Sequence, residues 1–427
     1  MKYIIRRFLF IGLGLMTYTS MSAQRTYTLD ECLDEALKNN VRIKNADNNL
    51  SAAQHTSKEA FTKYFPSLSA TGGGFMANKG LVQMEVAPEM EMSLLKNGIV
   101  GGVSASMPLF AGGQIVNANK LAKVNVEATR LQRGLSVNEV KLTTEQYFWQ
   151  IVKLKEMLKT LSSVEKQLES IRKDVEAAVS AGVTNRNDLL QVQLRKNETR
   201  STRISVENAL AVSRNLLAQY IGCVSDTIEV TYALDGTLPT SPHVLYRAPE
   251  TSLVLTNEYS LLQQNLKASR LQYKMSVGKN LPAVAIGGGY MYDNLMEKDH
   301  PFWVGFATVS VPLSGWWGGS HDMKKHKLQV RNAENQFADQ SQLLIIRIQN
   351  TWNDLTDAYQ QVEIAIESIG QATENLRLQT DYYHAGTCTM SDLLEAQTLY
   401  RQSRDKYVES YARYEVKKRE YLQVTGR

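Results

Sequence analysis

The sequence predicts a mostly α-helical protein with a small β-portion of membrane-crossing length, built as two structural copies. One turn is written twice, as "AGVTNRNDLLQV" at residues 181–192 and as "AGTCTMSDLLEA" at residues 385–396. Each turn follows a proline-free helical pattern of about 68 residues. A pair of glycine-rich segments with alternating hydrophobicity precedes each long pattern. Internal repetition of this kind defines the architecture of the whole chain.

Other segments repeat in the same order, so the whole chain is duplicated. "YFPSLSATGGGF" at 64–75 returns as "NLPAVAIGGGY" at 280–290, and "SMPLFAGGQ" at 106–114 returns as "SVPLSGWWGGS" at 310–320. The offset is 204 residues from Pro108 onward and about 216 before it, which places an insertion between the glycine-rich segments. The expected divisions are a first repeat at 24–222, a surface linker at 223–250 and a second repeat at 251–427.

Each copy is predicted to contain the same elements in the same order. A first helix ends at a proline, two β-segments follow, and two long helices are then joined by the repeated turn. Within the first, longer helical pattern of each copy, glycine occurs only as Gly134 and Gly370 after the opening residues. In the first copy the predicted first helix is 40–65, the strands are 67–77 and 99–109, and the long helices are 113–180 and the stretch from the turn to 220. In the second copy the corresponding ranges are 256–279 for the first helix, 283–293 and 302–313 for the strands, and 318–384 and the stretch from the turn to 423 for the long helices.

The first 23 residues predict export from the cytoplasm. Lys2, Arg6 and Arg7 precede the apolar run "FLFIGLGLM" and the small-residue stretch "TSMSAQ", which is the pattern of a signal peptide at 1–23. No cysteine follows at the spacing of a lipoprotein, so we expect no lipid anchor. No later run reaches about 18 apolar residues, so no transmembrane helix is expected, although β-strands can still enter a membrane.

The long helical patterns predict packing against equally long neighbours. About 68 helical residues span about 100 Å, far more than an ordinary domain, and such lengths indicate coiled-coil-like packing. In the last helix Leu393, Tyr400, Tyr407, Tyr414 and Tyr421 recur every seven residues. We expect this tyrosine stripe to pack closely against a neighbouring helix, either in a coiled-coil contact or as an ordinary core stripe.

The β-segments have the length and the alternation of membrane strands. About 9 to 11 residues cross a bilayer as a tilted strand. In the segment 99–109, Ile99, Val103 and Leu109 share one face and Ser104 and Ser106 the other. Apolar-outward and polar-inward alternation is typical of a membrane β-barrel. The alternative is a small soluble sheet.

Four strands per chain are too few to close a membrane barrel, for which about eight is the minimum. Unpaired strand edges are not tolerated in hydrocarbon, so the chain must oligomerise by strand pairing. Two, three or four copies would give 8, 12 or 16 strands. Tyr290, Tyr292, Phe302 and Trp303 gather near the loop between the third and fourth strands, which is consistent with an interfacial aromatic girdle.

Several functional classes are disfavoured by the composition. The formal charge of +5 includes three basic residues of the signal peptide, and the remainder is too small to indicate nucleic-acid binding. Cys32, Cys223 and Cys388 have unrelated spacings, which suit neither a disulfide framework nor a metal site. His321 and His326 are five residues apart and do not share a helical face as a four-residue spacing would. We therefore expect no enzyme activity, no metal and no cofactor.

Taken in order and twice over, the motifs resemble those of the TolC-like outer-membrane efflux family across the whole mature chain. They are "LDECLDEALKNN" near the start, the prolines Pro66 and Pro282 before the strands, "MPLFAGGQ" and "VPLSGWWGGS" before the long helices, and the duplicated AG-x5-DLL turn. The resemblance implies a homotrimer whose four strands per chain form a 12-stranded barrel and whose helices form a periplasmic α-barrel. It also implies contact with outer-membrane lipid, a periplasmic adaptor and an inner-membrane pump of the RND, ABC or MFS type.

The function implied by the resemblance is that of an outer-membrane exit duct in a tripartite efflux or type I secretion system. Such a duct moves small molecules or polypeptides out of the cell, and its pore-lining residues do not encode the cargo. The alternative, from a different class, is a periplasmic coiled-coil adaptor or scaffold that does not insert in the membrane. An adaptor would carry one helical hairpin, whereas this sequence predicts two.

The repeated turns are the candidate functional site. Each long helix must reverse direction there, and glycine is the residue best able to end a helix at positive φ. By the resemblance, the turns contact the adaptor and close the periplasmic mouth. The residues at the two tips are Gly182, Val183, Thr184, Gly386, Thr387 and Cys388.

Two interpretations apply to the acidic residues after the turns. In the first, Thr389 is a helix N-cap with Asp392 three residues on, and Asn185 with Asp188 repeats this capping arrangement. In the second, Asp392 and Glu395 lie on one helix face, and in a trimer they form a carboxylate ring that favours cations. The resemblance places an acidic selectivity ring at these two positions.

The resemblance also pairs Tyr383 with Asp188 in a hydrogen bond that holds the mouth closed. The sequence departs from the family at Cys388, where the best-studied members carry a basic residue that latches neighbouring coils. We therefore expect closure here to depend on Tyr383 and Asp188 or on other contacts.

Overall fold

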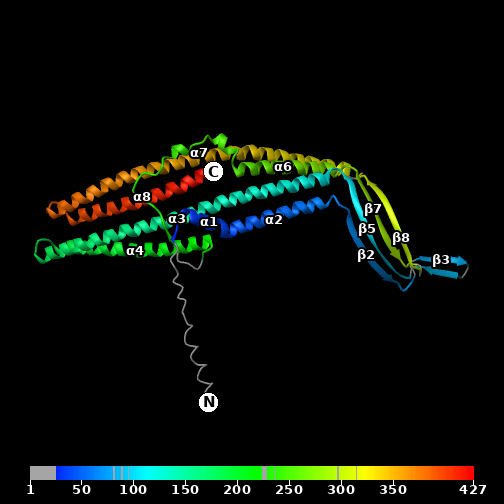
Figure 1. The fold of residues 1–427 in the computed structure, drawn as a ribbon, viewed down its shortest axis with the longest axis horizontal. Coiled ribbons are helices and arrows are strands. Elements are labelled where there is room, and N and C mark those ends of the chain that lie inside the picture. The colour runs from blue at the N-terminus through cyan, green and yellow to red at the C-terminus, as the bar shows by residue number, and fades with distance from the viewer. Residues whose placement is uncertain are drawn as a thin grey trace, which may run out of the picture. The chain divides into compact units, whose positions relative to one another are not determined.

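The computed structural model describes residues 26–79, 82–87, 90–94, 96–223, 228–234, 236–295, 298–313 and 315–427, and the predicted signal peptide lies outside them. The elements appear in Figure 1. The helices are α1 (Leu29–Asn39), α2 (Val41–Thr62), α3 (Gln114–Ser180), α4 (Arg186–Ile221), α5 (Pro249–Leu253), α6 (Asn257–Gly278), α7 (Gly315–His384), α8 (Met390–Val424) and the 3-10 helix η1 (Pro242–Leu245). The strands are β1 (Thr26–Tyr27), β2 (Ser67–Met76), β3 (Val82–Ala87), β4 (Met90–Leu94), β5 (Asn97–Ala111), β6 (Glu229–Val230), β7 (Ala283–Asp293) and β8 (His300–Ser310).

The chain forms two compact units, which are described separately. The unit that contains the sheet, here the sheet unit, comprises Val41–Asn138, Leu245–Asn353 and Tyr421–Arg427. The unit that contains the repeated turns, here the hairpin unit, comprises Met1–Asn40, Glu139–Val244 and Asp354–Glu420.

The predicted order of elements is confirmed in both copies. In each copy a helix leads to two strands of the main sheet, followed by a long helix of 67 residues (α3) or 70 residues (α7) and a second helix after the repeated turn. The helix α1 adds to the predicted set. It begins at a capping box, because the Thr28 amide donates to Glu31 at 2.8 Å and the Glu31 amide donates to the Thr28 hydroxyl at 3.3 Å.

The four predicted strands form one antiparallel sheet in the order β2-β5-β7-β8. The central pairing joins β5 of the first copy to β7 of the second, so neither copy forms its sheet alone. The insertion predicted from the change of offset contains a further hairpin, β3 with β4. The outermost strands of the main sheet are β2 and β8, and neither has an outer neighbour within the described residues.

The two faces of this sheet differ in polarity. Direct register partners share a face, and one row across all four strands consists of Ala70, Val103, Tyr290 and Trp303. Trp303 is 81% exposed in this row. The face therefore presents apolar side chains outward, as the predicted alternation requires.

The opposite face is polar where β2 meets β5. Ser69 and Ser104 are joined by a hydrogen bond of 2.9 Å between their hydroxyls, and Ser67 and Ser106 by another of 2.9 Å. The predicted placement of the serines opposite the apolar residues is thus present. Leu109 departs from the prediction, because the register with β7 shifts between Pro108 and Phe110 and ends the simple alternation.

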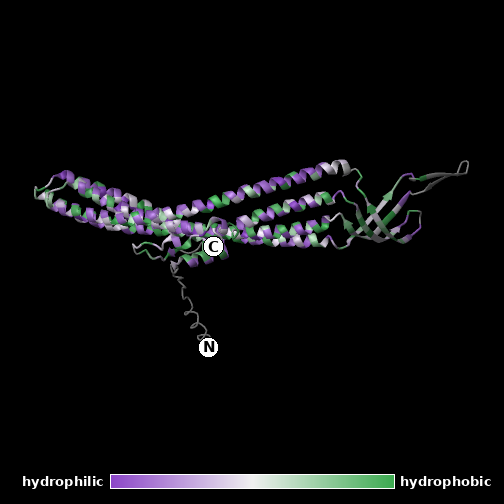
Figure 2. Ribbon diagram, turned by 90° about the horizontal axis from the view of Figure 1, so that it is seen from above, coloured by the Kyte–Doolittle hydropathy of each residue, from purple (hydrophilic) through white to green (hydrophobic). Residues whose placement is uncertain are grey.

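The hairpin unit contains the antiparallel pairs α3–α4 and α7–α8. Figure 2 shows hydrophilic and hydrophobic residues mixed along these long helices. Among the described residues, no helix combines the length and the apolar character needed to cross a membrane.

The tyrosine stripe of α8 has a role beyond helix packing. The Tyr414 hydroxyl donates to the carbonyl of Thr240 at 2.5 Å. The Tyr421 hydroxyl accepts from the amide of Arg247 at 3.0 Å. These hydrogen bonds hold the segment between the two copies against α8. From the sequence, the tyrosine stripe was predicted to contact only another helix.

The segment 223–250 is more structured than the predicted surface linker. Its strand β6 pairs in parallel with β1, and Val230 in that strand is buried. The Glu229 carboxylate accepts hydrogen bonds from Lys155 of α3 and Arg214 of α4. Because a partly buried carboxylate is stabilised by such partners, these contacts hold the segment against the α3–α4 hairpin.

Candidate functional site

The two repeated turns have the same backbone conformation. Gly182 and Gly386 have φ angles of +72° and +71°. The amide after each glycine, of Val183 or Thr387, donates at 2.9 Å to the carbonyl five residues earlier. This is the Schellman arrangement, in which a glycine at positive φ ends the helix and satisfies its last carbonyls. The positive φ predicted for both glycines is therefore present.

The helices that follow the turns begin with different caps. After the second turn, the Thr389 amide donates to Asp392 at 3.0 Å, and the Asp392 amide donates to the Thr389 hydroxyl at 3.2 Å. After the first turn, the Asp188 amide donates to Asn185 at 3.2 Å, but the Asp188 carboxylate accepts from the Thr184 hydroxyl. The capping interpretation is thus confirmed in full for α8, and in part for α4.

The side chains of Asp392 and Glu395 are both exposed on the first turns of α8. Hydrogen bonds from the Thr389 hydroxyl and amide hold the pKa of Asp392 below its usual value. Within the described residues neither carboxylate lies in an ion pair. Residues 360–400 contain six acidic residues and one basic residue, Arg377. That arginine pairs with Glu374 and Asp381 on its own helix, so it does not neutralise the exposed pair.

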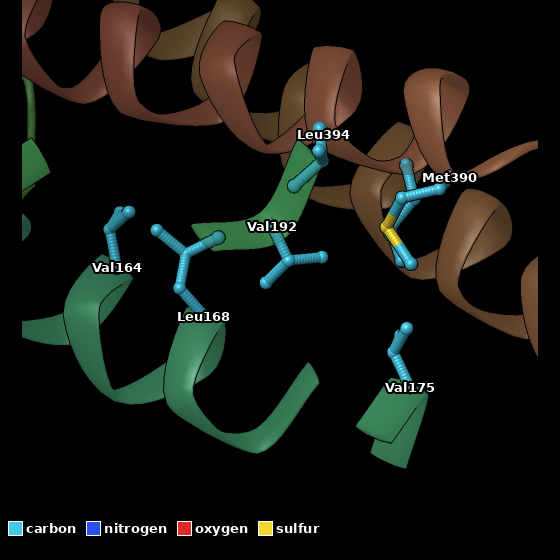
Figure 3. Close-up of a cluster of buried hydrophobic side chains, with 7 residues drawn as sticks. Val164, Leu168, Val175, Val192, Met390 and Leu394 are labelled. Atoms are coloured by element: carbon cyan, nitrogen blue, oxygen red, sulfur yellow. The ribbon is translucent and has the colours of Figure 1, made fainter. Parts of the chain in front are cut away.

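A shared hydrophobic cluster lies behind the turns and joins the two hairpins. Figure 3 shows Leu168 of α3, Val192 of α4 and Leu394 of α8 directed toward one another. Leu168 and Val192 are fully buried, and Met390 and Leu393 are nearly so. Because burial of each such side chain contributes about 1.5–3 kcal/mol, this cluster fixes the two turns relative to each other.

Tyr383 packs its ring against this cluster at the end of α7. Burial raises the pKa of Tyr383, and the neighbouring Asp188 carboxylate raises it further. Asp188 is therefore near the tyrosine. Among the contacts of the described residues, however, the Asp188 carboxylate bonds to Thr184 and not to the Tyr383 hydroxyl. The predicted Tyr383–Asp188 hydrogen bond is not part of this conformation of the single chain.

Cys388 lies inside the second turn and is partly buried. Its thiol donates to the carbonyl of Gln379 at 3.4 Å, and burial raises its pKa. The side chain thus contacts its own hairpin and has no charge with which to bind a neighbouring coil. The expected departure from the family's basic latch at this position stays a prediction.

An ion-pair network between α3 and α4 was not predicted from the sequence. Glu169 accepts from Arg172 at 3.0 Å and from Lys196 at 2.6 Å, and these hydrogen bonds lower its pKa to about 2. The three-residue spacing of Glu169 and Arg172 was visible in the sequence. The Lys196 contact depends on the register of the hairpin, which the sequence does not give. Among the described residues, no group of three potential metal ligands is close enough to hold a metal ion.

An antiparallel sheet with one exposed apolar face, joined to two long helical hairpins, defines a class of outer-membrane channel protein. The family model described as outer membrane efflux protein matches residues 32–223 and 252–422. These ranges cover most of both copies, so the chain belongs to the outer membrane efflux protein family.

Solved structures share the fold over nearly the whole chain. CusC aligns with a TM-score of 0.80 at 14% identity, over 93% of this chain and 92% of that one. The CmeC outer membrane channel of Campylobacter jejuni aligns with a TM-score of 0.77 at 14% identity, over 93% of this chain and 85% of that one. The open-state MtrE outer membrane channel of Neisseria gonorrhoeae aligns with a TM-score of 0.73 at 15% identity, over 93% of this chain and 88% of that one. At such identities the similarity concerns the fold, and no individual curated protein matches the sequence significantly.

Family membership confirms the predicted location in the outer membrane and the predicted role in efflux. The family is one of outer-membrane efflux channels rather than of enzymes. The alternative of a periplasmic adaptor or scaffold that never inserts is not supported.

Proposed function

We propose that three identical chains form an exit duct through the outer membrane, each donating its four-stranded sheet to a 12-stranded barrel. The observation that carries this proposal is the sheet itself. Its outer strands β2 and β8 have no outer neighbours among the described residues, and exposed backbone groups of that kind are not tolerated in lipid. Pairing β2 of one chain with β8 of the next removes every edge, and the exposed apolar face then meets the lipid.

In this proposal each copy, 24–222 and 251–427, supplies two strands and one helical hairpin to the assembly. The long helices form an α-barrel in the periplasm that continues the duct. The chain catalyses no reaction and binds no cofactor, so transport is energised elsewhere. An inner-membrane pump of the RND, ABC or MFS type supplies the energy, and a periplasmic adaptor contacts the exposed hairpin tips. The cargo consists of small molecules or polypeptides.

The narrow aperture of the duct lies at the second turn of each chain. Asp392 and Glu395 are exposed and lie outside ion pairs within the described residues, so three copies bring six unneutralised carboxylates together. A ring of this kind favours cations over anions. In the closed state of the proposed assembly Tyr383 and Asp188 contact each other, and opening rotates the hairpin tips outward and breaks that contact.

Ion selectivity in planar bilayers tests this aperture. The variant Asp392→Ala with Glu395→Ala is expected to raise anion conductance relative to cation conductance, because the negative ring is removed. The matched control is Glu363→Gln, an exposed carboxylate on α7 away from the turn. Unchanged selectivity in the double variant would exclude these two residues from the aperture while leaving the duct itself in place.

A further inference from the structure

An open groove lies between α2 and α3 in the sheet unit. Its volume is about 440 Å³, which is within the range of about 300–1,000 Å³ typical of small-ligand sites. Phe61, which is 55% exposed, and Val116, which is 43% exposed, give it an apolar surface. Lys58, Lys120 and Lys123 also line it. The groove therefore combines accessible apolar surface with concentrated positive charge.

The lysines around this groove recur in the second copy of the chain. Four exposed lysine positions next to the sheet are occupied by lysine in both copies, at the two offsets of the repeat. The pairs are Lys58–Lys274, Lys63–Lys279, Lys120–Lys324 and Lys123–Lys327. A second groove, of about 470 Å³, is lined by Lys324, Lys327, Arg331, Leu328 and Val330, and by Glu334, whose carboxylate pairs with Arg270. The basic character of this region is thus a repeated feature and not a property of one helix.

The eight lysines are exposed and mostly lack acidic neighbours, although Lys279 lies near enough to Asp322 to help lower the pKa of that carboxyl. Within the described residues none of them lies in an ion pair. Other lysines of the chain are neutralised, since Lys155 pairs with Glu229 and Lys417 pairs with Asp354. Unpaired cations held close together create a positive potential that attracts an anion.

The groove adjoins the part of the sheet unit that meets lipid. Helix α2 ends at Thr62 just before β2, and α3 begins at Gln114 just after β5. Exposed aromatic side chains lie where helices follow strands in both copies: Phe110, 47% exposed, at the end of β5, and Trp317, 72% exposed, in the first turn of α7. Aromatic rings gather at membrane–water interfaces, and basic residues beside them bind anionic headgroups.

We propose that the α2–α3 groove binds an anionic phospholipid of the leaflet that borders the helices. The lipid phosphate contacts Lys58, Lys120 and Lys123, and an acyl chain covers Phe61 and Val116. The related basic groove on α7 offers the same chemistry in the second copy. The inference rests on the proposed insertion of the sheet in the membrane and is independent of the aperture at the hairpin tips.

Native mass spectrometry of the purified assembly tests this site. The protein is exchanged into nanodiscs of phosphatidylcholine with a minority of phosphatidylglycerol, released into detergent, and the retained lipids are counted. Wild-type protein is expected to retain phosphatidylglycerol selectively. The variant Lys58→Gln, Lys120→Gln, Lys123→Gln is expected to lose that selectivity by at least about fivefold, since each lysine near a membrane surface contributes about 1 kcal/mol.

The matched control removes the same charge elsewhere, as Lys44→Gln, Lys166→Gln and Lys173→Gln, three exposed lysines away from the groove. It is expected to retain phosphatidylglycerol like the wild type. Equal retention of the two lipids by wild-type protein, or an equal loss in the control, would overturn the proposal. So would unchanged lipid retention with altered ion selectivity, because the lysines would then face the duct. Wild-type conductance in the same lipid mixture reports separately on membrane insertion.

Discussion

The α3–α4 turn and the α7–α8 turn share one backbone conformation but differ in the side chains that follow it. Both use a glycine at positive φ and the same Schellman hydrogen bond. After the first turn, Asp188 is engaged by Thr184, whereas after the second, Asp392 closes a reciprocal cap and Glu395 remains exposed beside it. The duplication therefore preserved the geometry that reverses the chain while the charge presented at each tip diverged.

The largest effect is expected where the two hairpins share a core. Leu168→Ala on α3 and Leu393→Ala on α8 should each lower the free energy of unfolding by about 2–5 kcal/mol, because a buried leucine is lost and a cavity remains. Thermal unfolding of the assembly, followed by circular dichroism at fixed protein concentration, measures this. The exposed Leu194→Ala, on α4, should have little effect. A large loss from only one of the two core variants would show that the hairpins do not share one core.

Substituting alanine for either turn glycine is expected to lower the free energy of unfolding by a smaller amount, the same at both turns. Gly182→Ala and Gly386→Ala should each destabilise the protein by about 1–2 kcal/mol, since alanine is strained at positive φ. No neighbouring atom lies within 4 Å of a Cβ added at either glycine, so the cost is conformational and not steric.

The control for these variants is Gly370→Ala in the interior of α7, where an added Cβ also meets nothing within 4 Å. There alanine should stabilise by up to about 1 kcal/mol, because glycine is a poor helix former. Unequal costs at the two turns, measured by the same unfolding experiment, would show that their backbones are not equivalent.

The smallest effect is the dependence of stability on pH that the cap at the start of α8 produces. The Thr389 hydrogen bonds depress the pKa of Asp392 in the folded state. Their contribution is therefore fully present above the unfolded pKa of about 3.9 and is lost as the pH falls through the folded value. The unfolding temperature of the wild type should fall more steeply below about pH 4 than that of Asp392→Asn. Parallel curves for the two proteins would exclude a stabilising cap at Asp392.

The main elements could be predicted because proline and glycine mark their ends. The start of β7 at Ala283, directly after Pro282, and the end of α7 at His384, before Gly386, agree with the sequence prediction to the residue. Alternation predicted the two faces of β5, and it failed only at Leu109, where a bulge shifts the register.

The contacts that were missed depend on the distances between segments far apart in the sequence. The bonds of Tyr414 and Tyr421 to the segment between the copies need both elements in place. The Thr184 hydroxyl donates to the Asp188 carboxylate because the turn brings the two side chains close. The sequence alone does not show that Asp188 would bond to Thr184 rather than to Tyr383. The proposed Tyr383–Asp188 contact and carboxylate ring depend on how chains would meet in the proposed trimer, and they stay predictions.

Disulfide cross-linking between neighbouring chains tests the shared barrel most directly. Ala70→Cys on β2 is combined in turn with Trp303→Cys, Gly305→Cys or Ala307→Cys on β8, residues that share its face of the sheet. Oxidation in isolated outer membranes should give, for at least one pair, a cross-linked ladder that ends at three chains, with no ladder for Ala70→Cys alone. A protein that stays monomeric on a non-reducing gel for every pair would contradict the pairing of β2 with β8 and the trimeric duct.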